Sequence, residues 1–377
     1  MAGIYIHIPF CKQACFYCDF HFSTSLKKKE EMLAALVSEI EMRKNELANE
    51  AIGTIYFGGG TPSLLSTNEI TQLIQAVYNN FEVVEHPEIT LEANPDDLAE
   101  KRLQSISKSP VNRLSIGIQS FFDEDLKLMN RAHNSEEAKQ SLSMATKYFD
   151  NISLDLIYGI PGMSHERWKQ NITIALNFGI SHISSYALTV EPKTALEKLI
   201  KNGLVEAPKD AIAKAQFHIL IDTLEAAGFI HYELSNFGKD GFFSQNNSAY
   251  WQGKQYLGVG PSAHSFNGKV RGWNISNNTL YIKSIQSGKL PSETERLTTT
   301  DRYNEYVMTG LRTIWGVSFK TVEQEFGHHY LKYLNMQAEK YVSEKLLYIE
   351  HDVLKTTKTG KFLADGIAAD LFKLNLL

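Results

Sequence analysis

The sequence predicts an α/β protein: a partial (β/α)6 barrel of the TIM kind, followed by a small, mainly helical, winged-helix-like domain. Two observations support this prediction. Six strand patterns alternate with helix patterns over about the first 190 residues, as they do in parallel α/β folds. Beyond residue 296 helical patterns dominate. Because six units are too few for a closed eight-stranded barrel, we expect a barrel open on one side. A doubly wound open sheet is the main alternative.

Each strand pattern is a short apolar segment, and helix patterns follow it along the chain. Residues 29–49 are typical of the helices, because Leu33, Leu36, Val37 and Ile40 fall on one face. The expected strands are residues 3–8, 54–57, 88–93, 113–119, 152–157 and 182–188. The expected helices are residues 29–49, 68–78, 96–106, 123–129, 136–148, 165–178 and 208–228.

The chain divides into three expected regions. Residues 1–230 form the barrel core, and residues 231–295 are interpreted as connecting loops because much of this region is rich in Gly, Asn and aromatic residues. Residues 296–377 form the C-terminal domain. Its expected elements are helices at 303–311, 320–325 and 336–345, with a β-wing made from residues 346–354 and a turn at 359–360.

The composition is that of a soluble globular protein and gives no sign of a nucleic-acid-binding or membrane-spanning protein. Of the 377 residues 43% are hydrophobic and 21% are charged, and the net charge of −5 gives no indication of nucleic acid as the main partner. No apolar run approaches the roughly 20 residues that cross a bilayer, so we expect no integral membrane segment. The first residues resemble a strand and not a secretion signal. We therefore expect a cytoplasmic protein.

The three cysteines of the chain, Cys11, Cys15 and Cys18, lie within eight residues directly after the first strand pattern. An odd, clustered set is no disulfide framework and is typical of metal binding or redox chemistry. Its position is the carboxyl end of the barrel, where active sites lie. A [4Fe-4S] cluster on these thiolates would leave one iron without a cysteine ligand, free to chelate a small molecule. A zinc site that adds His21 is the alternative.

Further candidate residues follow the other strands. The GGGTP segment (residues 58–62) lacks the Gly-Lys-Ser/Thr of a phosphate loop, but its glycines let the backbone come close to a ligand. Glu92, Gln119 and Asp155 lie in or at the ends of three successive strands, and Arg131 follows soon after. One such polar residue is usually structural, whereas three aimed at one mouth indicate a site. A carboxylate suits ribose hydroxyls or an ammonium, and an arginine suits a carboxylate.

Four motifs extend this pattern: IHIPFC (residues 6–11), YFGGGTP (56–62), GIQS (117–120) and DLIYGIPG (155–162). Together with the CxxxCxxC spacing and Tyr17 before the third cysteine, they resemble the oxygen-independent coproporphyrinogen III oxidase group of the radical S-adenosylmethionine (SAM) superfamily. The resemblance covers nearly the whole chain. It implies a [4Fe-4S] cluster whose open iron binds SAM, and a reductant such as flavodoxin or ferredoxin.

The resemblance also implies which residues contact SAM. In the superfamily the GGGTP motif meets the SAM amino group. The positions of this chain that match SAM contacts are Tyr5, Gly59, Gly60, Thr61, Glu92, Gln119, Arg131, Asp155 and Ala187.

Two branches of this group differ in function: a decarboxylase, HemN, and a branch regarded as haem-binding chaperones, HemW. Phe20 stands where the decarboxylase has a further cysteine, and the chain begins almost at the first strand, without the decarboxylase's N-terminal arm. NNSAYW (residues 246–251) resembles the chaperone motif His-Asn-x-x-Tyr-Trp. These features favour the chaperone branch, which implies haem or a porphyrin as ligand and haem-accepting proteins as partners.

The match to that motif has one important difference. Asn246 occupies the histidine position, and an amide is a poor ligand for haem iron. His264, in GVGPSAH (residues 258–264), is the nearest candidate ligand, with a hydrogen-bonded structural histidine as the equal alternative. Tyr250 and Trp251 are either core aromatics or stack on a macrocycle.

The sequence therefore favours a HemW-like protein that binds a cluster, SAM and haem and passes haem to acceptor proteins. Two alternatives remain open. One is oxidative decarboxylation of coproporphyrinogen III. The other is a radical SAM enzyme with an unrelated substrate, since the cluster generates the radical and the pocket selects the target.

Overall fold

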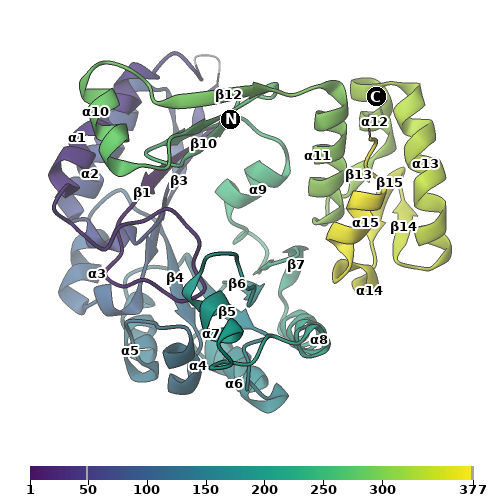
Figure 1. The fold of residues 1–377 in the computed structure, drawn as a ribbon, viewed down its shortest axis with the longest axis horizontal. Coiled ribbons are helices and arrows are strands. Elements are labelled where there is room, and N and C mark those ends of the chain that lie inside the picture. The colour runs from purple at the N-terminus through teal and green to yellow at the C-terminus, as the bar shows by residue number, and fades with distance from the viewer. Residues whose placement is uncertain (48–49, 375–377) are drawn as a thin grey trace.

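A computed structural model describes residues 1–47 and 50–374 of the chain. Its centre is a twelve-stranded sheet in the order β12-β11-β10-β9-β1-β2-β3-β4-β5-β6-β8-β7 (Figure 1). All six strands expected of the barrel are present, and each is parallel to the next. They are β1 (Ala2–Ile8), β2 (Ile52–Gly59), β3 (Val83–Ala93), β4 (Arg113–Gln119), β5 (Ile152–Tyr158) and β6 (His182–Ala187). The predicted fold class is confirmed.

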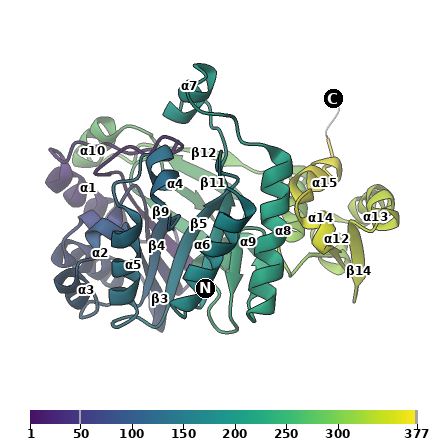
Figure 2. The ribbon, with the colours of Figure 1, turned by 90° about the horizontal axis from the view of Figure 1, so that it is seen from below.

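Helices cover the outer face of these strands (Figure 2). They are α1 (Lys29–Met42), α2 (Thr67–Asn80), α3 (Glu100–Ile106), α4 (Asp123–Leu128), α5 (Ser135–Ala145), α6 (His165–Asn177) and α8 (Asp210–Ala226). The short α7 (Ala195–Lys201) stands away from this layer, and the 3₁₀ turns η1 (Pro62–Leu64) and η2 (Pro95–Asp97) follow β2 and β3. The helix predicted for residues 29–49 is too long. It ends at Met42 with Arg43 as the C-cap, where the Arg43 side chain turns inward to Glu39 and the Gly258 carbonyl, and residues 48–49 lie outside the described part.

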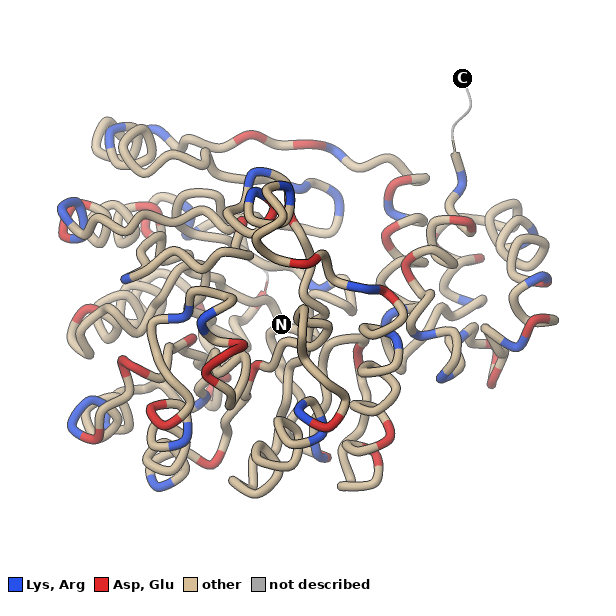
Figure 3. Tube along the Cα trace, turned by 60° about the horizontal axis from the view of Figure 1, so that its bottom comes forward, with Lys and Arg blue, Asp and Glu red and all other residues tan. Residues whose placement is uncertain are grey.

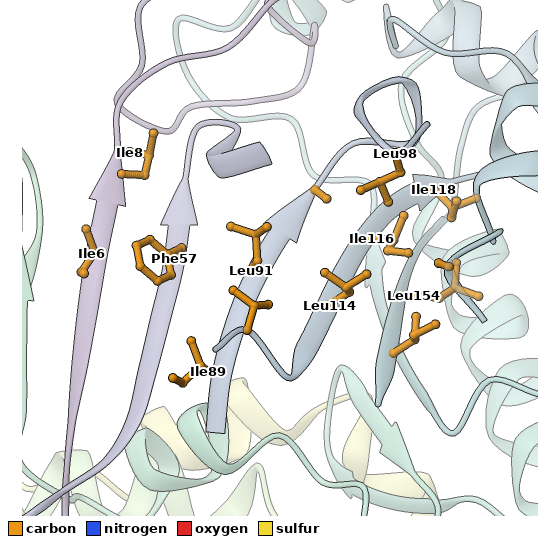
Figure 4. Close-up of a cluster of buried hydrophobic side chains, with 14 of the residues drawn as sticks. Ile6, Ile8, Phe57, Ile89, Leu91, Leu98, Leu114, Ile116, Ile118 and Leu154 are labelled. Atoms are coloured by element: carbon orange, nitrogen blue, oxygen red, sulfur yellow. The ribbon is translucent and has the colours of Figure 1, made fainter. Parts of the chain in front are cut away.

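The main core lies between the strands and these helices. Ile6, Phe57, Leu91, Ile116 and Leu154 project from five neighbouring strands to the same side of the sheet and are fully buried (Figure 4). Because side chains alternate along a strand, the residues between them face the interior of the barrel. Those residues are largely polar, which makes the barrel interior available for chemistry.

The structure corrects the expectation that residues 231–295 are connecting loops. They contain β8 (Asn236–Gly238), α9 (Gln245–Trp251), β9 (Tyr256–Val259), β10 (His264–Phe266), β11 (Val270–Asn274), α10 (Asn278–Gln286) and β12 (Ser292–Arg296), and β7 (Ile230–Glu233) begins just before them. Two of these short strands extend the edges of the barrel: β9 pairs with β1 and β8 with β6. The barrel partners of β9 and β8 are distant in sequence, so the local pattern did not reveal them. The other strands pair with their neighbours in the chain.

Helix α9 lies across the amino ends of the barrel strands. The backbone N–H groups of Gln245 and Asn246, at its first turn, donate to the Glu88 carboxylate at 3.0 and 3.1 Å. The Thr54 hydroxyl donates to the Asn246 side chain at 3.0 Å. Glu88 and Thr54 belong to β3 and β2 on the strand halves farthest from the cysteines. Helix α9 therefore closes the end of the barrel opposite the cysteines.

The C-terminal region has a core of its own beside the barrel (Figure 1). Its elements are α11 (Thr299–Leu311), β13 (Val317–Ser318), α12 (Phe319–Phe326), α13 (His328–Ser343), β14 (Leu347–Glu350), β15 (Val353–Thr356), α14 (Lys358–Lys361) and α15 (Ala364–Asp370). The expected wing exists, but its turn is His351–Asp352, where both φ angles are positive, and residues 359–360 belong to α14. The proposed domain limits at residues 230 and 296 stay predictions.

A buried carboxylate joins the added strands to the barrel. Glu39 of α1 is fully buried, and its oxygens accept hydrogen bonds from Arg43 at 2.9 Å and from the Gly260 N–H at 2.7 Å. Asn274 of β11 and the Tyr281 hydroxyl of α10 donate to it at 2.7 and 2.5 Å. With so many donors, the buried charge is compensated, and four segments are held together by one side chain.

We predict that Glu39→Ala lowers the free energy of unfolding by about 3–5 kcal/mol, because the buried donors of Gly260, Asn274 and Tyr281 and one N–H of Arg43 lose their common acceptor. Denaturant unfolding followed by circular dichroism measures the change. Glu41→Ala, on an exposed position of the same helix, is the control and should differ little from wild type. Equal stability of the two variants would contradict the role given to Glu39.

Candidate functional site

A cavity of about 420 Å³ opens at the carboxyl ends of the barrel strands. It brings together all three cysteines, the GGGTP turn, and residues from the ends of β3, β4, β5 and β6. Of the residues predicted to bind SAM or the cluster, those that line it are Cys11, Cys15, Tyr17, Cys18, Gly59, Gly60, Thr61, Glu92, Gln119, Arg131, Asp155 and Ala187. The convergence of distant segments at one mouth follows from the parallel arrangement of the strands.

The cysteines occupy a loop that is closed at its base. The Cys11 N–H donates to the Ser23 carbonyl at 3.1 Å, and the Ser23 N–H donates to the Pro9 carbonyl at 3.0 Å. On its far side the loop is tied to Asn130, which accepts from Gln13 and donates to the Ala14 carbonyl. All three thiols are half-buried and free. The loop thus presents its three sulfurs to the same cavity.

This sulfur set fits a [4Fe-4S] cluster, which needs one thiolate on each of three irons. Burial raises the pKa of the Cys18 thiol to about 11. Cluster irons supply the positive charge that makes such a thiol a thiolate ligand. The zinc alternative would need His21 as a fourth ligand beside the cysteines. In the structure His21 Nε2 lies 2.7 Å from Asn278 Oδ1, and no three described His, Cys, Asp or Glu side chains are placed to share one metal ion.

The GGGTP turn packs directly against the cysteine loop. The Gly60 N–H donates to the Ile8 carbonyl at 2.9 Å, and the Thr61 N–H donates to the Phe10 carbonyl at 2.6 Å. A Cβ on Gly60 would lie 2.5 Å from the Phe10 carbonyl oxygen, so only glycine permits this approach. The close contact places the turn and the cysteines on one rigid wall of the cavity.

Arg131 links the cysteine loop to the strand ends. Its Nη1 lies 3.3 Å from Cys15 Sγ, and its Nη2 donates to the Gly117 carbonyl and to Asn94 Oδ1, both at 2.8 Å. Asn94 in turn donates to the Thr61 hydroxyl at 3.3 Å. Arg131 thus holds the cysteine loop, the end of β4 and the GGGTP turn together at the cavity wall.

Two half-buried carboxylates, Glu92 and Asp155, line the cavity. Burial raises the pKa of Glu92 to about 7 and that of Asp155 to about 6. The Tyr56 hydroxyl donates to Glu92 at 2.8 Å, and Arg113, itself buried, offsets part of the negative charge. A cationic ligand would favour the ionised form of both carboxylates. The pair therefore suits a ligand that carries an ammonium or sulfonium group.

Gln119 carries local backbone strain. Its φ of 67° is in the left-handed region, where a non-glycine residue is uncommon. The residue ends β4, and its Nε2 is 2.9 Å from where a Cβ on Gly117 would stand. The strained backbone turns the Gln119 side chain into the cavity.

Two of the predicted cofactor-binding residues lie outside the cavity lining. Tyr5 is one layer deeper in the barrel, stacked on Tyr56 with ring centroids 6.0 Å apart and hydrogen-bonded to His7. His264 is exposed on β10. Sequence analysis missed Asn94 and Tyr186, which line the cavity from the ends of β3 and β6. Glu92 was predicted because it is a polar residue near the carboxyl end of a barrel strand, and the same criterion would have identified Asn94 and Tyr186.

The side chains of Asn246, Tyr250 and Trp251 in the NNSAYW segment all contact other protein groups. Asn246 is buried at the amino end of the barrel and hydrogen-bonded to Thr54, so its side chain does not face the cysteine cavity. Tyr250 packs edge-on against Tyr256, with centroids 4.5 Å apart. The Arg312 guanidinium of the C-terminal region lies 4.9 Å above the Trp251 ring. Both aromatic rings thus contact protein groups at the bottom of the barrel.

Comparison with known proteins agrees with this geometry. The radical SAM superfamily model matches residues 5–175, and the HemN C-terminal domain model matches residues 297–363. The haem chaperone HemW of Bacillus subtilis is 34% identical over 97% of this chain and 98% of its own length. The chain belongs to the HemW family of radical SAM proteins. HemW of Lactococcus lactis is similar, at 31% identity over 96% of this chain and 97% of its own length.

The structure of coproporphyrinogen III oxidase (HemN) from Escherichia coli superimposes with a TM-score of 0.85, covering 99% of this chain and 90% of that chain at 22% identity. At this identity the match shows a common fold. Membership of the radical SAM superfamily implies a [4Fe-4S] cluster and SAM, which the cavity residues fit. Cys11, Cys15 and Cys18 would hold the cluster, and a reduced cluster would supply the electron for cleavage of an S–C bond of SAM. No helix of the described residues has the length and apolarity to cross a membrane.

We expect the anaerobically purified protein to be brown and to hold about four irons per chain. Replacing Cys11, Cys15 or Cys18 by alanine should abolish the cluster absorbance, because each sulfur serves a separate iron. Metal analysis measures the iron content, and visible spectroscopy measures the cluster absorbance of the wild type and of each variant. One zinc and no iron per chain would contradict the cluster and restore the zinc alternative.

We expect Glu92→Gln to stabilise the SAM-free protein at pH 8 by up to about 3 kcal/mol. The folded pKa of Glu92, about 7, exceeds its ordinary value of 4.5, so the fold loses stability as the pH rises between these values, and glutamine avoids the loss. The same variant should bind SAM more weakly, because a cation loses its carboxylate. Thermal unfolding at pH 5 and pH 8 and calorimetry with SAM test the two effects.

Glu85→Gln is the matched control, because Glu85 is exposed on the same strand. It should change neither property. Wild-type SAM affinity in Glu92→Gln would remove Glu92 from the binding site.

Proposed function

We propose that the protein holds a [4Fe-4S] cluster on Cys11, Cys15 and Cys18, binds SAM in the adjoining cavity, and acts as a haem chaperone that passes haem to acceptor proteins. The observation that carries the proposal is the full-length similarity to proteins named as haem chaperones. The cysteine-lined cavity supports the cluster and SAM parts. A reductant such as flavodoxin or ferredoxin would supply the electron, and three free thiols suit the reducing cytoplasm.

The mouth of the cavity supports the chaperone branch over the decarboxylase. Phe20 is 67% exposed there, at the position where the decarboxylase branch has a further cysteine. Decarboxylation requires the radical beside a propionate in a pocket closed to solvent. Release of haem to another protein requires an accessible site. Among the described residues, charges of both signs are interspersed along the chain (Figure 3).

Haem added to the purified protein should show a shifted Soret band and saturable binding, whereas coproporphyrinogen III incubated anaerobically with SAM and reductant should remain unchanged. Spectrophotometric titration and product chromatography make the two measurements. A variant with all three cysteines replaced by alanine separates haem binding from cluster binding. Formation of protoporphyrinogen IX would replace the chaperone by the decarboxylase.

A further inference from the structure

We infer that haem binds on a sheet surface made by β9, β10 and β11, with His264 as the axial ligand of the iron. The inference rests on the proposed function and names the site for its cargo. The cysteine cavity, at about 420 Å³, is taken by the cluster and SAM in that proposal, so a large flat cargo needs another surface. The amino end of the barrel is closed by α9.

We call this surface the aromatic face and define it by Tyr256, His264, Phe266, Arg271 and Trp273. In the antiparallel pairing, Phe266 lies opposite both Tyr256 and Arg271, and His264 lies opposite Trp273. Directly opposed residues project from the same side of a sheet. The ring centroids of His264 and Trp273 are 6.3 Å apart, and those of Tyr256 and Phe266 are 6.2 Å apart. The face thus carries two pairs of neighbouring rings on one side of the sheet.

The next residue along β10 points to the other side of the sheet and fixes the strand. The Ser265 hydroxyl accepts from Arg43 at 3.1 Å and from the Gly258 N–H at 2.9 Å, and Arg43 belongs to the buried Glu39 network. Gly258 is needed here, because a Cβ on it would lie 2.0 Å from the His264 carbonyl oxygen. The glycine and the buried network hold the backbone of His264 in place.

The His264 ring is available for coordination. It is exposed, and no described residue forms a hydrogen bond or ion pair with it. In contrast, His7 and His21 are engaged by the His21 carbonyl and by Asn278. Partial burial and then the nearby Arg271 charge lower the pKa of His264, which favours the neutral imidazole at pH 7. Neutral imidazole is the form that binds haem iron.

The remaining groups match the other parts of haem. Phe266 and Trp273 offer ring surfaces to an apolar macrocycle, and Tyr256, which packs against Tyr250, adjoins Phe266. Arg271 pairs with Glu305 of α11, and the other N–H groups of its guanidinium are donors for a propionate. Across the sheet, Glu293 and Glu295 of β12 lie opposite Trp273 and Arg271. Because Glu295 lies beside Arg271 and Glu305 is ion-paired with it, a propionate at Arg271 has to compete with these carboxylates.

Haem titration of the cluster-loaded protein tests the site. His264→Ala should weaken haem binding by about tenfold or more and move the Soret maximum, because the axial ligand is lost. Trp273→Ala should weaken binding without moving the maximum, since it removes ring contact alone. His329→Ala is the matched control, because His329 is also exposed beside an aromatic ring, Tyr330, and should behave as wild type.

Chemical rescue provides a second readout. Added imidazole should restore the wild-type Soret maximum in His264→Gly, and cluster absorbance should stay unchanged in every variant. Wild-type spectra and affinity in His264→Ala would overturn this site while leaving haem binding by the protein intact. Failure of the wild-type protein to bind haem would overturn the proposed function and the site together.

Discussion

The alternation of side chains along six parallel strands is the constraint on which the site depends. Apolar residues such as Ile6 and Leu91 face the helices and form the core, and the residues between them must face inward. All strands run in the same direction, so their carboxyl ends meet at one mouth. Side chains from positions as distant as Cys11 and Ala187 therefore line one cavity.

This arrangement places charged groups where solvation is poor. Glu92 and Asp155 have raised pKa values because of burial, and Arg131 lies beside Cys15. In the ligand-free protein the two carboxylates oppose folding above neutral pH. Bound cationic groups would relieve that opposition, so ligand binding and stability are coupled at the same side chains.

The extension of the sheet beyond β1 gives the protein a second surface. Strands β9 to β11 continue the barrel wall, and Glu39 fastens them to α1 through hydrogen bonds to Gly260 and Asn274. Helix α9 meanwhile fills the amino end of the barrel. The cofactor cavity lies at the carboxyl end of the barrel, α9 fills the amino end, and the added strands form a separate surface. His264 is exposed on that surface and therefore lies outside the cofactor cavity.

The sequence by itself determined the fold class and the six barrel strands, because periodicity is a local property. Strand-end position indicated the cysteines, Glu92, Gln119 and Asp155, and the family resemblance added further residues, such as Tyr17 and Ala187, to the twelve predicted residues that line the cavity. Only the tertiary structure decided which of residues 231–295 form strands, since β9 forms its hydrogen bonds with β1, more than two hundred residues away in the sequence. It also decided that Asn246 is a buried packing residue and that His264 is accessible, because burial depends on partners that no local pattern contains.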